Sequence, residues 1–382
     1  GERDPGADEV AVLALLRRSL LKHAFAVAVL LLVPIAALAQ PTRITFLHTN
    51  DVYEITPARG WGGYAQLMTA LRQERAASPN TVTTFGGDLL SPSIMSGFTR
   101  GAQMIEMLNA IGTDIAVLGN HEFDFGNDVM RDRVRESRFP WLATNVTGAN
   151  GALLDGTVDY VIREIAGFKV GFFGIVTPET TELSSPAAGT RFAAYIATAN
   201  TAVRTLRERG AEVIVALTHL NLAEDRQIAR EVPGIALILG GHDHDAISFL
   251  EGSTLVHKSG SDARYLGIVE LALTRQQPQS GPATIEIVPS WRMVPVRAMT
   301  PDAEVAQLVR RHTDRLDAEL NVEIGTTAHP LDSRRVIVRE SEAAIGNLIA
   351  DAMRDAVGAE IGLMNGGGIR GDRTYDAGHR FT

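Results

Sequence analysis

The chain has 382 residues, a formal net charge of −9 at pH 7 and no cysteine, with 45% apolar and 21% charged residues. This composition is typical of globular proteins, excludes disordered, collagen-like and coiled-coil classes, and allows about two domains with buried cores. Without cysteine there are no disulfides, zinc–thiolate sites, iron–sulfur clusters or cysteine nucleophiles, so any metal must be held by His, carboxylate, amide or hydroxyl groups. The mild acidity disfavours nucleic acid as a partner, because phosphate contacts need a basic surface.

The N-terminal segment has the organisation of a secretory signal peptide. Arg17, Arg18 and Lys22 precede an apolar run over 24–39 that ends in Ala-Leu-Ala. A basic region, an apolar region and an A-x-A end predict cleavage after the run, with a retained membrane anchor as the alternative. We therefore expect residues 1–40 to be an extension and signal peptide, and the mature protein to be periplasmic or secreted without a stable membrane anchor. The arginine pair also fits a twin-arginine export signal, which carries folded proteins.

Short apolar runs alternate with helical patterns from Thr42 to about Val296. Such alternation predicts a layered α/β domain with a buried sheet. The clearest helices are Tyr64–Ala76 and Ala199–Arg209. The predicted strands are Ile44–Leu47, Val82–Phe85, Ile115–Leu118, Val170–Val176, Val213–Leu217 and Ile235–Leu239.

A single helix is predicted over Pro301–Leu320. Thr300 is a suitable N-cap, proline suits the first helical position, and apolar residues then repeat at helical spacing. A new segment follows, with a strand-like Val336–Val338, a helix near 343–356, and an apolar run over 361–364 that leads into a glycine cluster. Because the sequence stops after a turn-rich stretch, we expect this segment to be the beginning of a truncated second α/β domain.

Five predicted strands end in side chains that suit a metal ion. The strand ends read His48-Thr-Asn-Asp51, Gly-Gly-Asp88, Gly-Asn120-His121, Thr-His219 and Gly-Gly-His242-Asp-His244. Ligands in α/β sheets gather at the carboxyl ends of strands, so we expect these groups to converge on one site. Oxygen and nitrogen donors without sulfur suit Mn, Zn, Fe or Co in a site that is open to substrate.

The order of these residues resembles the calcineurin-like metallophosphoesterases. Residues 47–51 (Leu-His-Thr-Asn-Asp) and 118–124 (Leu-Gly-Asn-His-Glu-Phe-Asp) are similar to the bacterial 5′-nucleotidase and UDP-sugar hydrolase family. Residues 346–351 (Gly-Asn-Leu-Ile-Ala-Asp) and 365–370 (Asn-Gly-Gly-Gly-Ile-Arg) resemble that family's C-terminal nucleotide-binding domain. The resemblance extends from about Thr42 to the last residue.

The resemblance implies a fold and a division into domains. Residues 41–297 would form the catalytic domain, a metallophosphoesterase β-sandwich flanked by helices. Residues 298–320 would be the linker helix, and residues 321–382 a partial nucleotide-binding domain of α/β type.

The resemblance also implies two divalent metal ions (Mn, Zn, Co or Fe) that share the carboxylate of Asp88. Asp51 and His244 would hold one ion, and Asn120, His219 and His242 would hold the other. Two such cations clamp a phosphate and activate a water, which attacks phosphorus in line with the leaving ester oxygen.

Other residues would act on the substrate. His121 would stabilise the transferring phosphoryl group or protonate the leaving oxygen, and Asp124 can orient His121 and favour its protonated form. The alternative for Asp124 is a carboxylate in the first turn of a helix. By resemblance Asn365 and Arg370 would contact the nucleotide, and so would Arg339, for which the alternative is a solvated charge at a strand edge.

Tyr53 departs from the family pattern. The resemblance places a histidine ligand two residues after Asp51, whereas this chain has tyrosine there. Tyrosine can bind a metal as phenolate, which favours a hard ion such as ferric iron. It can also lie behind the ligands and leave that position to water, which is the interpretation we favour.

These features predict an exported, metal-dependent phosphoester hydrolase, a 5′-nucleotidase that releases phosphate from nucleoside monophosphates. Nucleotide sugars and 2′,3′-cyclic nucleotides are further candidate substrates. Thiosulfohydrolases of sulfur oxidation are the alternative on the same fold, and a non-catalytic nucleotide- or metal-binding protein with a degenerate site is an alternative of another class. The expected partner is a small nucleotide, and we expect the protein to be a monomer.

Overall fold

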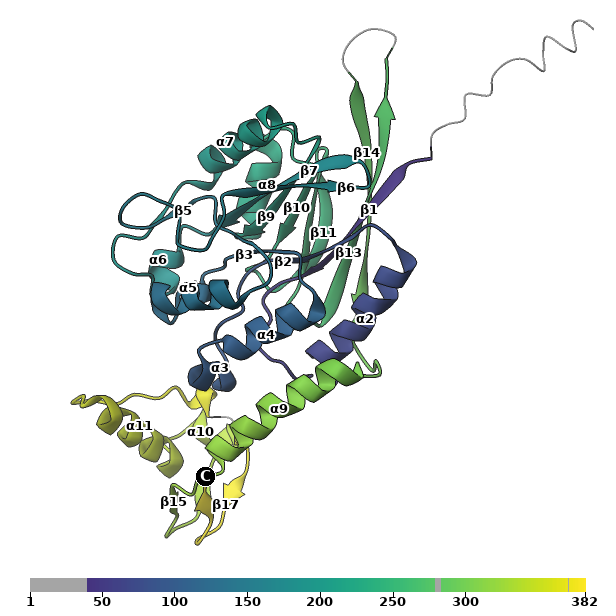
Figure 1. The fold of residues 1–382 in the computed structure, drawn as a ribbon. Coiled ribbons are helices and arrows are strands. Elements are labelled where there is room, and N and C mark those ends of the chain that lie inside the picture. The colour runs from purple at the N-terminus through teal and green to yellow at the C-terminus, as the bar shows by residue number, and fades with distance from the viewer. Residues whose placement is uncertain (1–39, 279–282, 370) are drawn as a thin grey trace, which may run out of the picture. The chain divides into compact units, whose positions relative to one another are not determined.

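The computed structural model describes residues 40–278, 283–369 and 371–382 (Figure 1). The predicted signal peptide, apart from Gln40, and the candidate nucleotide contact Arg370 lie outside these ranges. Within them, no helix combines the length and the apolar character needed to cross a membrane.

The chain divides into two compact units. The smaller unit contains residues up to Ile44 and Glu270–Ser290; in it Gln276 Nε2 donates to Glu286 Oε2 at 2.9 Å. The larger unit contains Thr45–Val269 and Trp291–Thr382, and with them every described residue predicted for the site.

The first of two six-stranded sheets has the order β14-β13-β1-β2-β3-β4. Its strands are β1 (Thr42–Thr49), β2 (Thr81–Phe85), β3 (Ile115–Val117), β4 (Trp141–Leu142), β13 (Tyr265–Gln276) and β14 (Thr284–Pro295). Strands β1 to β4 run parallel, with Thr45 opposite Thr81 and Ala116 opposite Trp141.

The second sheet has the order β11-β12-β10-β9-β7-β6. Its strands are β6 (Tyr160–Ile165), β7 (Phe168–Val176), β9 (Val213–His219), β10 (Leu237–Gly240), β11 (Ala246–Glu251) and β12 (Thr254–Ser259). The four central strands are parallel, and β6 and β11 are antiparallel edges. All six strands predicted from apolar runs overlap observed strands of the two sheets.

The two sheets pack against each other. The rings of Phe46 on β1 and Phe172 on β7 meet edge to face at 6.3 Å between centroids. Gly174 on β7 allows the close approach, because a Cβ at this position would lie 2.4 Å from Cβ of Leu142 on β4. The fold is therefore a β-sandwich, as the resemblance implied.

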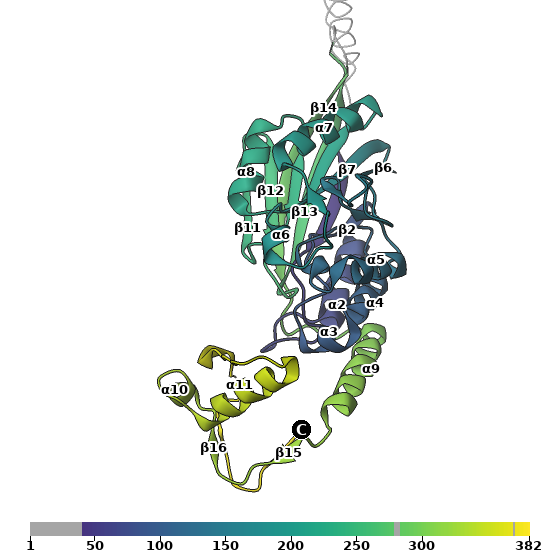
Figure 2. The ribbon, with the colours of Figure 1, turned by 90° about the vertical axis from the view of Figure 1, so that its left-hand side faces the viewer.

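Helices cover the sandwich (Figures 1 and 2). Leu206 of α7 and Ile228 of α8 are fully buried in one core cluster with Ile214 of β9, and each such side chain contributes about 1.5–3 kcal/mol. On α2, Arg75 donates to Thr83 Oγ1 of β2 at 2.7 Å. The helices are α2 (Tyr64–Ala77), α3 (Ile94–Thr99), α4 (Ala102–Ile111), α5 (Gly126–Glu136), α6 (Thr180–Leu183), α7 (Tyr195–Glu208) and α8 (Leu222–Glu231); the short strands β5 (Val146–Thr147) and β8 (Arg191–Phe192) pair with each other.

The linker helix α9 (Ala303–Leu320) begins two residues later than predicted. The N-cap is Asp302, not Thr300, because its side chain accepts the N–H of Val305 at 3.2 Å. The Asp302 carboxylate also pairs with Arg72 Nε of α2 at 3.0 Å, which ties the start of α9 to α2.

The segment after the linker contains little regular structure. The predicted strand Val336–Val338 is wrong: these residues lie in the short helix α10 (Arg335–Val338), whose first N–H bonds to Asp372 Oδ1 at 2.8 Å and which buries Val338 but leaves Val336 exposed. The predicted helix near 343–356 is confirmed as α11 (Ala344–Val357). The remaining elements are β15 (Gly325–Thr326) paired with β18 (Arg380–Phe381), β16 (Leu331–Asp332) paired with β17 (Thr374–Tyr375), and a 3₁₀ turn at Gly366–Gly368.

Candidate metal centre

The predicted ligands lie at the carboxyl ends of strands from both sheets. Asp51, Asp88 and Asn120 follow β1, β2 and β3 of the first sheet, while His219 ends β9 and His242 and His244 follow β10 of the second. Five strand ends therefore meet where the two sheets pack together.

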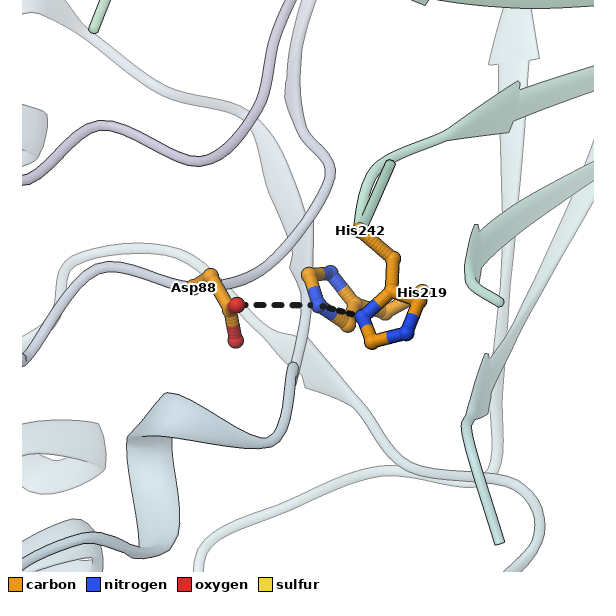
Figure 3. A group of neighbouring side chains, drawn as sticks. All are labelled: Asp88, His219 and His242. Carbon is orange, nitrogen blue, oxygen red and sulfur yellow. Dashed lines mark hydrogen bonds and ion pairs between the residues drawn. The ribbon is translucent and has the colours of Figure 1, made fainter. Parts of the chain in front are cut away.

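Three of these side chains form a compact cluster (Figure 3). The donor atoms of Asp88, His219 and His242 all lie within 4.8 Å of one another. Asp88 Oδ2 is 3.1 Å from His219 Nε2, and His242 Nδ1 is 3.3 Å from the same nitrogen. One carboxylate and two imidazoles at this spacing are suitable ligands for one divalent ion.

The backbone at the ligands is unusual. Asp51, Asp88, His242 and His244 all have positive φ, between 52° and 84°. Such conformations cost about 1–3 kcal/mol each and are concentrated at functional sites. Gly119 is required beside them, because a Cβ there would lie 2.2 Å from Asp88 Oδ1.

Two further details fit a bound metal. His219 Nδ1 donates to the carbonyl of Gly86 at 2.8 Å, which orients the ring so that Nε2 faces the cluster. Asn120 is buried, and its Oδ1 has no hydrogen-bond partner in the described part of the chain. A buried acceptor without a donor is costly unless a cation satisfies it, so this residue set fits a divalent ion.

Asp51, His244 and Tyr53 form a second, looser group. His244 Nε2 lies 3.2 Å from Asp51 Oδ1, and the Tyr53 hydroxyl lies 2.9 Å from His244 Nε2. The same hydroxyl donates toward Asp88 Oδ2 at 3.3 Å and Asp51 Oδ1 at 3.4 Å. Burial, together with the charges of Asp88 and Asp51, raises the pKa of Tyr53 far above its usual value.

His121 and Asp124 lie beside the cluster. His121 Nδ1 is 2.6 Å from Asp124 Oδ2, and the backbone N–H of His121 donates to Asp88 Oδ1 at 2.8 Å. Ser184 Oγ donates to the other Asp124 oxygen at 2.6 Å. Burial lowers the pKa of His121, but the Asp124 hydrogen bond and the Asp88 charge outweigh it and raise this pKa.

Burial and neighbouring charges both shift the pKa values of Asp88 and His242. Burial favours the neutral form of Asp88, yet the neighbouring His219 imidazole lowers the pKa of this carboxyl below its ordinary value. Burial and the charge of His219 together lower the pKa of His242 to about 4, so His242 is neutral and can offer a lone pair.

Several residues that hold the site were missed by sequence reasoning. The buried carboxylate of Glu122 accepts the N–H groups of Asp88 at 3.0 Å and Leu89 at 2.7 Å, and burial and the Asp88 charge raise its pKa to about 7. The position of Glu122 between His121 and Asp124 in the sequence is the feature that could have identified it as part of the site. Asn50 donates to Asp51 Oδ2 at 2.6 Å, and it directly precedes that candidate ligand in the sequence.

Lys258 on β12 was also missed, and nothing in the sequence marked it. Its buried ammonium donates to the carbonyls of Leu220 at 2.6 Å and Gly241 at 2.8 Å. It also pairs with Asp225 Oδ2 at 2.9 Å and with Asp243. Lys258 thus connects the strand ends that carry His219, His242 and His244.

The predicted nucleotide contacts lie in the segment after the linker. Arg339 and Asn365 line a cavity of about 560 Å³ together with Val338 and Gly366–Gly368. Asn365 Oδ1 accepts the N–H of Gly367 at 3.0 Å, which shapes the glycine turn. The structure therefore brings Arg339 and Asn365 together, and Arg370 lies outside the described residues.

Comparison with known proteins identifies similar chains. The family described as calcineurin-like phosphoesterase matches residues 44–246, and the 5′-nucleotidase C-terminal domain matches residues 323–379. The trifunctional nucleotide phosphoesterase YfkN of Bacillus subtilis is 28% identical over 86% of this chain and 25% of its own length. The 5′-nucleotidase of Bos taurus is 28% identical over 87% of this chain and 65% of its own length.

A solved structure supports the same relationship. The 5′-nucleotidase precursor of Thermus thermophilus superposes with a TM-score of 0.66 at 26% identity, over 89% of this chain and 72% of that chain. The chain spans between a quarter and about two thirds of the length of the two relatives named above. The family match over 44–246 covers more than half of its residues, and the chain therefore belongs to the calcineurin-like phosphoesterase family.

Proposed function

We propose that this chain is a metal-dependent phosphoester hydrolase of the 5′-nucleotidase type, which releases phosphate from nucleoside monophosphates. One observation carries the proposal: the donor atoms of Asp88, His219 and His242 lie within 4.8 Å of one another, beside His121, whose Nδ1 contacts the Asp124 carboxylate at 2.6 Å. Relatives named as 5′-nucleotidases, and the C-terminal match over 323–379, support a nucleotide as the substrate.

Two divalent ions would be held in this site. Asn120, His219 and His242 would hold one, Asp51 and His244 the other, and Asp88 would be shared; Mn, Zn, Co and Fe all suit these donors. When bound, such ions neutralise phosphoryl oxygens and supply a nucleophilic water. Asn50 and Glu122 fix the carboxylate of Asp51 and the turn at Asp88, so that the donor groups need little rearrangement.

His121 would act on the phosphoryl group or the leaving oxygen. Because Nδ1 is held by Asp124, a protonated ring presents its other N–H, at Nε2, toward the cluster, 3.8 Å from Asp88 Oδ2. That N–H can stabilise a developing negative charge or give its proton to the departing ester oxygen.

Substrate recognition would fall to the segment after the linker. Arg339 and Asn365 line its cavity, and with Arg370 they would contact the nucleotide. We propose residues 41–297 as the catalytic domain, 298–320 as the linker helix and 321–382 as the nucleotide-binding part. Nucleotide sugars and 2′,3′-cyclic nucleotides are additional candidate substrates.

We also propose that the protein is exported and acts as a monomer in the periplasm or outside the cell. The basic and apolar sequence pattern over 17–39 supports export. N-terminal sequencing of the protein recovered from the periplasm would show a start near Gln40, whereas an intact N-terminus in the membrane fraction would contradict cleavage.

The decisive experiment is metal analysis of the chain combined with a panel of substrates. We expect phosphate release from AMP in the presence of Mn²⁺, and loss of that release after chelation. Sulfate release from a thiol-bound sulfonate, without phosphate release, would instead support a thiosulfohydrolase. Binding of nucleotide or metal without any hydrolysis would support a non-catalytic binding protein.

A further inference from the structure

The two groups of candidate ligands differ in the burial of their side chains and in the spacing of their donor atoms. Asp88 and His219 are fully buried, and their donor atoms lie with that of His242 inside a 4.8 Å cluster. The Gly86 carbonyl orients His219, and the buried Oδ1 of Asn120, which follows β3, has no hydrogen-bond partner among the described residues. Three candidate donors for one ion are therefore already gathered at this position.

The position of Asp51 and His244 is less complete. Asp51 Oδ1 lies 3.2 Å from His244 Nε2, while its Oδ2 accepts the N–H of His242 at 2.9 Å and Asn50 Nδ2 at 2.6 Å. The His244 side chain is 48% exposed, and a solvated imidazole loses more freedom when it binds an ion.

Tyr53 lies among the donor atoms of this second position. Its hydroxyl is within 3.4 Å of oxygens of both Asp51 and Asp88 and 2.9 Å from His244 Nε2. The hydroxyl thus occupies the space between these donor atoms, where the family pattern places a histidine ligand, and its shortest contact is with His244 Nε2. A tyrosine side chain supplies neither the imidazole nor the carboxylate donor that suits divalent Mn, Zn, Co or Fe.

We propose that the two positions bind divalent ions with unequal affinity, and that Tyr53 makes the Asp51–His244 position the weak, exchangeable one. This inference rests on the proposed function only for the assumption that both positions take ions. At limiting metal the protein then carries one ion per chain, and full occupancy requires free metal in excess. The weaker position is expected to bind about 10- to 100-fold less tightly, the range over which groups around a metal change affinity.

The test is a Mn²⁺ titration of the full chain after removal of bound metal by chelation. Calorimetry should resolve two steps, and elemental analysis after dialysis should give one ion per chain. Electron paramagnetic resonance should show an isolated Mn²⁺ signal at the first equivalent and a spin-coupled pair only at the second. Uptake of two ions in a single step would overturn the proposal.

Amino-acid substitutions identify which metal position gives rise to each binding step of the titration. Tyr53→His supplies an imidazole and should strengthen the second step at least tenfold while leaving the first unchanged, and no change in the second step would contradict the role of Tyr53. Tyr53→Phe should keep the two steps apart; loss of the second step would mean that the phenol is itself a ligand and would also overturn the proposal. His244→Ala should remove only the weak step, and His242→Ala should remove the tight one.

The unchanged first step is the internal control for folding in the Tyr53 variants. Phosphate release from AMP at saturating Mn²⁺ separates this inference from the proposed function. Hydrolysis with equal binding of both ions would refute only the unequal affinity. Two separate steps without hydrolysis would refute only the nucleotidase.

Discussion

The strand ends of the sandwich and the segment after the linker helix are built in opposite ways. Around Asp88 and His219 the candidate ligands are mostly buried, and buried groups such as Glu122 and Lys258 fix the turns that carry them. Beyond residue 321 the regular strands are two residues long, and apolar side chains such as Ile361 and Leu363 are 76% and 85% exposed.

We relate this difference in burial to two proposed tasks, which are to position the metal ions with the phosphoryl group and to contact the nucleotide. Orienting charges around a metal and a phosphoryl group requires a rigid, buried arrangement, because small displacements of donors cost affinity and rate. In the proposed division of tasks, Asn365 and the glycine turn Gly366–Gly368, which line one cavity with Arg339, would contact the nucleotide. Substitutions in the first region should therefore affect turnover and metal binding, and those in the second should affect substrate affinity.

The largest effect is expected for Asp88→Asn. The substitution keeps the shape of the side chain but removes the charge that both ions would share, so AMP hydrolysis should fall on the order of 10³-fold, about 4 kcal/mol of transition-state stabilisation. Measurement of kcat/KM and of bound metal checks this. Asp128→Asn, at an exposed position on α5, is the matched control and should behave as wild type. Full activity of Asp88→Asn would remove the basis for placing the chemistry at the strand ends.

Lys258→Met tests whether the hydrogen bonds of this buried ammonium hold the segments that carry His219, His242 and His244 in place. The substitution leaves Asp225 and Asp243 without their cation and frees the carbonyls of Leu220 and Gly241, so the free energy of unfolding should fall by about 3 kcal/mol. Metal affinity, measured at low temperature on the folded protein, should fall about tenfold.

Lys169→Met is the control for that variant, since Lys169 is exposed and its loss should change stability by less than about 0.5 kcal/mol. A destabilised Lys258→Met protein with unchanged metal affinity would make Lys258 a structural residue and weaken the contrast between the two regions.

Asp124→Asn should lower kcat by about 10²-fold. Asp124 raises the pKa of His121, so the protonated ring persists to higher pH and activity is lost as pH rises through that raised pKa. Removing the charge lowers this pKa, and the alkaline limb of the pH–rate profile should move to lower pH. A reduced rate with an unshifted profile would instead indicate that Asp124 serves only as a carboxylate in a helical first turn.

Sequence reasoning predicted that the candidate ligands lie close together because one rule applied to all of them. Parallel strands end at a common edge, so polar residues placed directly after β1, β2, β3, β9 and β10 had to lie near one another. The rule depends only on where an apolar run stops, which is visible in the sequence.

Features that depend on partners distant in sequence could not be predicted in this way. Lys258 needs Asp225, and Asp302 caps α9 while it pairs with Arg72. The β-branched residues over Val336–Val338 favour a strand locally, but the bond from Arg335 to Asp372 Oδ1 stabilises a helical turn. The convergence of the candidate ligands was predictable from local pattern, and the residues that position them were not.

The smallest effect is expected in the segment after the linker, for Asn365→Ala. Its Oδ1 caps the glycine turn through the N–H of Gly367 at 3.0 Å, and its side chain lines the cavity with Arg339. Loss of about 1 kcal/mol of hydrogen bonding should raise KM for AMP about fivefold and leave kcat unchanged, since this group would bind the ground state and the transition state equally. Asn200→Ala, on the exposed surface of α7, is the control. A fall in kcat at constant KM would contradict the division of tasks, because a residue of the open segment would then contribute to the chemical step that we assign to the buried strand ends.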